Sequence, residues 1–98
     1  MTKRTEIENA LRRLAPRIPK HECEATVDHA MISKGLTQAT AGTAAWLSLV
    51  AYVRHALTEY DELLTQGYDQ ESARFFVAAE IDAVLSSWGV GRKLTAID

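Results

Sequence analysis

The strongest constraint on the fold is a run of apolar residues at helical spacing in the middle of the chain. Its members recur every three or four positions: Trp46, Leu49, Val50, Val53, Leu57, Tyr60 and Leu64. This spacing places the side chains on one face of an α-helix, and the first half, "AAWLSLVAY", is apolar almost all round. We therefore predict one long helix over residues 43–65 that is contacted on several sides. The pattern leaves open whether this helix bends near Thr58.

Two shorter helices are predicted before it. The first spans about residues 5–15, because the capping box "TEIE" opens it and Pro16 prevents its continuation. The second spans about residues 19–33, with Pro19 in its first position and Gly35 as a left-handed cap after its end. Their apolar faces are formed by Ile7, Leu11 and Leu14 in the first helix and by Cys23, Val27, Ala30 and Met31 in the second.

The remaining segments are a loop, a last helix and a tail. Residues 36–42, "LTQATAG", are predicted to form the most mobile loop. Asp69 caps a helix over about residues 69–88, and Gly67 occupies the turn before it. The apolar face of this helix comprises Ala73, Val77, Ile81, Val84, Leu85 and Trp88. The tail, residues 90–98, is expected to be loose or to dock on a partner.

Composition indicates one small all-α domain over residues 1–98, a compact bundle of about four helices with a long central third helix. The hydrophobic content of 47% supplies one modest core, so a homo-oligomer, most simply a homodimer, is expected. No apolar run is long enough to span a bilayer, and the N-terminus lacks a secretory signal pattern. The single cysteine cannot form an internal disulfide. These features predict a cytoplasmic protein without membrane contact.

Charge is unevenly distributed along the chain. Residues 1–20 hold six basic and two acidic residues, a net charge of +4, whereas residues 21–98 carry −6. Within the basic segment, Arg12, Arg13 and Arg17 would contact phosphates if the first two helices acted as a helix-turn-helix. The overall acidity favours an ordinary basic surface over a duplex-DNA site.

The stretch "YVRHALTEYDELL" is the densest cluster of chemistry-capable side chains. On a continuous helix, His55 would point away from the apolar seam together with Glu59 and Glu62, which is typical of a solvated face. Arg54 and Asp61 would flank the seam, half-buried, and hold the helix to a neighbour.

A buried ion pair is predicted between this stretch and the last helix. Glu80 falls inside the apolar arc of that helix, where a carboxylate is costly unless it is paired. Arg54 is the favoured partner, ahead of Tyr60 or His29. A catalytic role for Glu80 or His55 is the weaker interpretation, since structural ion pairs also shift pKa values.

The segment "HECEATVDH" has metal-ligating residue types without metal-ligand spacing. On a helix, His21, Glu24 and Asp28 share a face, while Cys23 points toward the apolar side. The chain has no HExxH, GxSxG, phosphate-binding glycine loop or CxxC motif. We therefore predict no metal and no cofactor, and assign no catalytic residue.

Three segments resemble a known bacterial family. They are "LAPRIPKHECEATVDHAM", "VAYVRHALTEYDELL" and "ARFFVAAEIDAVLSSWG", which together lie within residues 14–89. They resemble the uncharacterised proteins of the domain of unknown function 2293. The most specific block comprises Arg54, His55, Thr58, Tyr60 and Asp61. The resemblance implies a shared fold and an intracellular bacterial origin, and no reaction.

The leading functional hypothesis is a non-enzymatic interaction module: an adaptor, regulator or inhibitor that binds another protein or a second copy of itself. Its expected contact regions are the basic first helix, Arg54 with Asp61, and the "LTQATAG" loop. Direct nucleic-acid binding through residues 3–20 is the first alternative. An enzyme of unknown reaction using His55 or Glu80 is the second.

Overall fold

The computed structural model describes residues 2–95, and this part of the chain contains helices and no strand. In chain order the elements are α1 (Lys3–Leu14), α2 (Lys20–Ile32), the 3-10 helix η1 (Lys34–Leu36), α3 (Ala41–Leu57), α4 (Tyr60–Thr65) and α5 (Gln70–Ser87). The all-α prediction is confirmed. None of these helices is long and apolar enough to cross a membrane.

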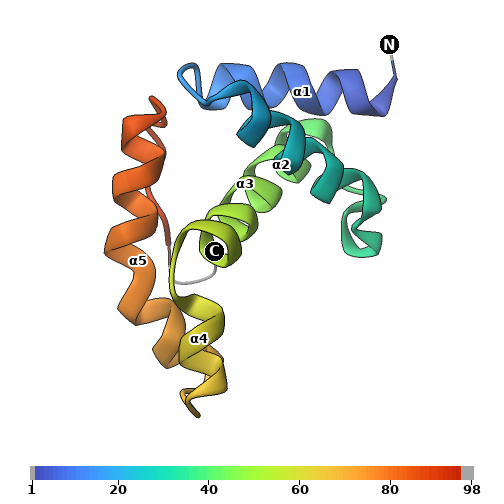
Figure 1. Ribbon diagram of the computed structural model, residues 1–98. Coiled ribbons are helices and arrows are strands. Elements are labelled where there is room, and N and C mark those ends of the chain that lie inside the picture. Colours follow the sequence, from blue (N-terminus) through green and yellow to red (C-terminus); the bar gives the residue numbers. More distant parts are fainter. Residues whose placement is uncertain (1, 96–98) are drawn as a thin grey trace.

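Helix α3 is central, as its periodicity predicts. The α1–α2 hairpin packs across its first half, and the α4–α5 hairpin packs near its other end (Figure 1). The molecule measures 43 × 28 × 23 Å, so it is elongated rather than spherical. Because α5 packs mainly against α3 and α4, its opposite side is left uncovered by the other helices.

The core joins the two hairpins through α3. Its largest fully buried side chains are Trp46, Ile7, Leu11, Leu49, Ile81, Leu85, Val27, Val50, Val53 and Val77. They come from the four stretches of predicted apolar spacing, which is why the pattern alone identifies them. Two residues of the predicted apolar faces are exposed, Met31 and Leu57, and both lie in the last turn of their helices, α2 and α3.

Helix capping follows side-chain chemistry, with one shift from the prediction. The hydroxyl of Thr2 accepts a hydrogen bond from the Thr5 N–H at 3.1 Å, so α1 begins earlier than the predicted capping box. At α5 the carboxylate of Asp69 accepts from the Ser72 N–H at 2.7 Å, which confirms the predicted cap.

Glycines at positive φ mark two turns. Gly67 and Gly89 adopt φ values of 103° and 88°, a region that side chains with a Cβ avoid. The prediction of a left-handed cap at Gly35 is wrong. Ser33 leaves α2 in an extended conformation and the chain continues directly into η1, so no left-handed residue is needed there.

The tail follows the body of the molecule as far as the structure describes it. The Val90 N–H donates to the Leu85 carbonyl at 3.0 Å, and the Val90 side chain is buried. The guanidinium of Arg92 lies 4.2 Å from the centre of the Trp46 ring. Val90 and Arg92 of the predicted loose tail thus contact the body of the molecule, and residues 96–98 lie outside the described part.

Candidate interaction surface

The predicted long helix is divided by a corner at Thr58. This residue is extended, with φ −132° and ψ 173°, and separates α3 from α4. Its hydroxyl donates to the Arg54 carbonyl and accepts from the Tyr60 N–H, the second bond at 3.2 Å. The continuous helix over residues 43–65 is thus wrong, because a side chain offers the backbone an alternative partner.

The most specific sequence block builds this corner. The Tyr60 ring, 3% exposed, has the Arg54 guanidinium 5.6 Å from its centre and the His55 ring edge-on at 5.3 Å. The Nδ1 atom of His55 lies 2.6 Å from Asp61 Oδ1, and both side chains are exposed. The break turns α4 relative to α3, so His55 meets Asp61 instead of the two predicted glutamates. Each side chain of this block therefore takes part in a contact at the corner between α3 and α4.

The predicted ion pair between Arg54 and Glu80 does not form. Arg54 is buried at 7% exposure, but Glu80 is exposed, and the ion pairs among residues 2–95 do not join them. The reason is the narrow contact of α5: its core face centres on Val77 and Ile81, and Glu80 lies at the edge of that face.

Arg17 is hydrogen-bonded to the C-terminal end of α5. Its Nε donates to the Ser87 carbonyl and its Nη2 to the Ser86 carbonyl, each at 3.2 Å. Its N–H donates to the Trp88 carbonyl at 2.9 Å, and a Cβ at Gly89 would lie 3.1 Å from Pro16. These are the orphan carbonyls of a helix C-terminus, where a positive charge is favourable. Arg17 is therefore a helix cap supplied from the other end of the chain.

The other two candidate arginines are exposed on α1. Arg12 lies 3.5 Å from Glu8 in an i,i+4 pair. Arg13 borders a shallow hollow together with Trp46 and Arg92. Arg17 is thus hydrogen-bonded to α5, whereas Arg12 and Arg13 lie on the exposed side of α1.

The "HECEATVDH" segment is held by local contacts. Cys23 is buried, as predicted, and burial is the main cause that raises the pKa of its thiol. Asp28 pairs with Arg4 at 2.6 Å, and His21 pairs with Glu22 at 2.7 Å. Within residues 2–95 no three His, Cys, Asp or Glu side chains lie close enough to hold a metal ion.

A polar seam lies between α2 and α3. Burial, and then a hydrogen bond with Glu22, raise the pKa of the Tyr52 hydroxyl. Nearby polar atoms, Ser48 Oγ and His29 Nδ1, are buried without a hydrogen-bond partner in the described structure. None of these residues lines the hollow beside Trp46 or the groove along α5.

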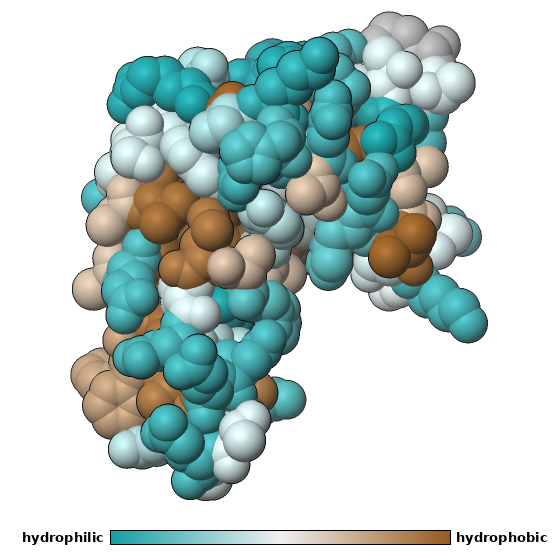
Figure 2. Space-filling view, viewed as in Figure 1, coloured by the Kyte–Doolittle hydropathy of each residue, from teal (hydrophilic) through white to brown (hydrophobic). Residues whose placement is uncertain are grey.

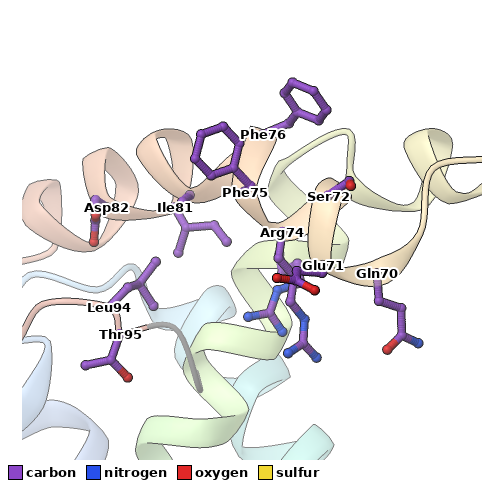
Figure 3. Close-up of a pocket in the computed structure, with 12 residues that line it drawn as sticks. Gln70, Glu71, Ser72, Arg74, Phe75, Phe76, Ile81, Asp82, Leu94 and Thr95 are labelled. Atoms are coloured by element: carbon purple, nitrogen blue, oxygen red, sulfur yellow. The ribbon is translucent and has the colours of Figure 1, made fainter.

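A groove of about 820 Å³ runs along one side of α5 (Figure 3). Its wall carries Arg54, Arg74, Glu71 and Asp82, and the tail contributes Leu94. Acidic and basic groups alternate there, so the groove has no single charge preference.

A cluster of exposed aromatic residues adjoins this groove. Phe75 is 79% exposed, Phe76 54% and Tyr68 44%. The Phe76 ring centre lies 5.4 Å from that of Tyr68 and 6.0 Å from that of Phe75, both edge-on. Both phenylalanines also line the groove, on the other side of α5 from Arg74 in Figure 3, and Figure 2 shows a hydrophobic patch at this end of α5.

These aromatic residues begin an uncharged stripe along the helix. At 100° per residue, six side chains fall within an arc of roughly 100° opposite the core. This set, the α5 outer face, comprises Ser72, Phe75, Phe76, Ala79, Ala83 and Ser86. All are at least partly exposed. An exposed helix side normally carries charges, so four turns without one are unusual.

Sequence reasoning missed this face. In the segment "ARFFVAAE" the predicted apolar face includes only the residues that face the core. Plotting the same residues around the helix shows two apolar sides, a signal that was present in the sequence.

No curated protein and no solved structure matches the chain. A family model described as "Uncharacterized conserved protein (DUF2293)" matches residues 10–89, from the second half of α1 to the end of α5. The matched segment includes the corner and the α5 outer face, and it agrees with the resemblance of the three sequence segments. The chain therefore belongs to the DUF2293 family of uncharacterized conserved proteins.

Proposed function

We propose that the chain is a protein-interaction module whose binding site is the α5 outer face. The observation that carries this proposal is the exposure of Phe75 and Phe76, side by side, on a helix whose opposite side is already packed in the core. Large exposed apolar patches on folded proteins mark interaction sites.

Burial of this patch supplies part of the free energy that binding requires. A phenylalanine or similar aromatic presents roughly 200 Å² when fully exposed, so Phe75 and Phe76 leave about 270 Å² in water. Burial of that area against a partner contributes about 6–7 kcal/mol before association costs. Aromatic anchors of this kind dominate the energetics of protein interfaces.

The patch is presented on a rigid support. Val77, Ile81 and Leu85 anchor the inner side of α5 in the core. Asp69 caps its first turn and Arg17 binds its last carbonyls. A helix fixed along its length and at both ends loses little conformational entropy on binding, which favours affinity.

A site-specific photo-crosslinker tests the proposal in cells. We expect a defined adduct with one protein when the crosslinker replaces Phe76, and none when it replaces Glu24, an exposed residue of α2. The adduct should disappear when Phe75→Ser is added, since that change removes the neighbouring anchor without disturbing the core. Equal labelling from both positions, or an adduct that survives Phe75→Ser, would contradict the assignment of the binding face.

A further inference from the structure

We infer that the partner of the α5 outer face is a basic amphipathic helix belonging to another protein. This inference rests on the proposed function and adds the charge and shape of the bound segment. Three features of the described residues support it: the charges beside the stripe, the size of its side chains, and the absence of a matching segment within this chain.

The α5 outer face has acidic edges. Glu80 lies along one edge, and Glu71 and Asp82 lie along the other. The only basic residue of α5, Arg74, lines the groove beside Glu71 and Asp82 (Figure 3), so carboxylates still outnumber it along that edge. Across α4 and α5, residues 59–87 contain seven acidic residues and one basic residue, a net charge of −6.

This charge pattern selects a basic partner. A segment that lies on the stripe would place its own flanking residues beside carboxylates on both sides. Lysine or arginine at those positions is attracted, whereas glutamate or aspartate is repelled. The same field repels nucleic acids and anionic lipid surfaces, which carry phosphate groups.

The side chains of the stripe fit a helix. Phe75 and Phe76 form a bulky first half, and Ala79, Ala83 and Ser86 form a shallow second half. Small residues allow a second helix axis to approach to about 8 Å, and bulky residues of the partner can fill the space above them. The complementary segment is thus a helix with one apolar stripe and basic residues on both of its sides.

A second copy of this chain does not satisfy these requirements. Two α5 helices facing each other would bring Glu80 and Asp82 against the same carboxylates of the copy. The basic helix α1 cannot serve either, because its apolar residues Ile7 and Leu11 are buried in the core. Neither α1 nor α5 of a second copy therefore fits, and we assign the occupant to a different protein.

Three synthetic peptides of about 18 residues, or five helical turns, test this inference on the full chain. The first has an apolar stripe of leucine and alanine flanked by lysines. The second replaces the lysines with glutamates, and the third has the composition of the first in an order that abolishes the stripe. Binding is followed by titration into isotope-labelled protein, with backbone amide shifts mapped onto the structure.

We expect the basic peptide to shift amides along α5, and the acidic and reordered peptides to bind at least about tenfold more weakly. In the double variant Glu80→Lys with Asp82→Lys, the preference should reverse toward the acidic peptide. Phe76→Asp should abolish binding, and circular dichroism should show an unchanged fold, because Phe76 is exposed.

Several outcomes would overturn the inference. Equal affinity for the basic and acidic peptides would show that charge does not select the partner. Shifts confined to α1 and α2, or no binding of any peptide, would remove α5 as a site for such a helix. Concentration-dependent shifts on α5 without peptide would identify a second copy as the occupant. If the Phe76 crosslink is nevertheless found, the proposed interaction face stands and only the basic helical partner falls.

Discussion

Replacement of Thr58 by valine should lower the free energy of unfolding, because valine lacks the hydroxyl oxygen of threonine. The Thr58 hydroxyl satisfies the Arg54 carbonyl and the Tyr60 N–H at the α3–α4 corner. Valine has nearly the same shape and favours the extended conformation found there, so it introduces neither strain nor a large cavity. The change therefore isolates the loss of two hydrogen bonds at a half-buried position.

The expected cost follows from the number of bonds. Each lost hydrogen bond contributes about 1 kcal/mol, so Thr58→Val should lower the free energy of unfolding by about 2 kcal/mol. For a domain of this size that corresponds to a fall in Tm of about 8–16 °C. The loss is a large fraction of the stability of a small domain.

Thr65→Val is the matched control. Its hydroxyl makes one bond, to the Asp61 carbonyl at 3.1 Å, at an exposed position. That variant should lie within about 0.5 kcal/mol of the wild type. Urea unfolding followed by circular dichroism measures both variants, with an unchanged dependence on urea expected. If Thr58→Val were no less stable than Thr65→Val, the corner would not depend on this hydroxyl, and the explanation for the helix break would be wrong.

Three further predictions concern single side chains. Arg17→Met should lower the free energy of unfolding by about 1 kcal/mol more than Arg13→Met does, because only Arg17 binds the α5 carbonyls; equal urea midpoints for the two would contradict this role. The hydrogen bond from the Ser72 N–H lowers the pKa of the Asp69 carboxyl group. The ionised carboxylate therefore stabilises the fold fully at pH values above the ordinary carboxyl pKa. This stabilisation is lost as the pH falls through the lower pKa of the folded state. The stability difference between the wild type and Asp69→Asn, measured from pH 7 to acid, should shrink over that window, and a constant difference would refute the linkage. Burial raises the pKa of the Cys23 thiol, so it should react slowly with a disulfide reagent at neutral pH in the folded state and rapidly in urea; equal rates would place the thiol at the surface.

The helices were predictable because local spacing and local caps determine them. The core faces of α1 and α5 follow from residues three and four apart, and Asp69 caps a segment that begins beside it. The corner at Thr58 was harder to predict from the sequence, because the apolar spacing continues through it. Leu57, Tyr60 and Leu64 keep the helical period even though the backbone at Thr58, between α3 and α4, is extended. The break depends on a hydroxyl that competes with the helix, and periodicity does not record that competition.

The candidate site was less predictable, since exposure depends on where distant elements pack. Glu80 lies at the margin of the α5 apolar arc, and only the narrow contact with α3 and α4 shows that it is exposed. Arg17 was assigned to a basic surface, yet it binds carbonyls 69 and 70 residues away in the sequence. No local pattern encodes such a contact.

The bond between Arg17 and the end of α5 also has a topological consequence. The Arg17 N–H meets the Trp88 carbonyl, and Gly89 packs on Pro16, so positions 16 and 89 are neighbours in space. The entry and exit of the intervening segment therefore lie at one point on the surface. The hydrogen bonds of Arg17 thereby close the chain between positions 17 and 88 into one loop, and the end of α5 can separate from the α1–α2 hairpin only if these bonds break.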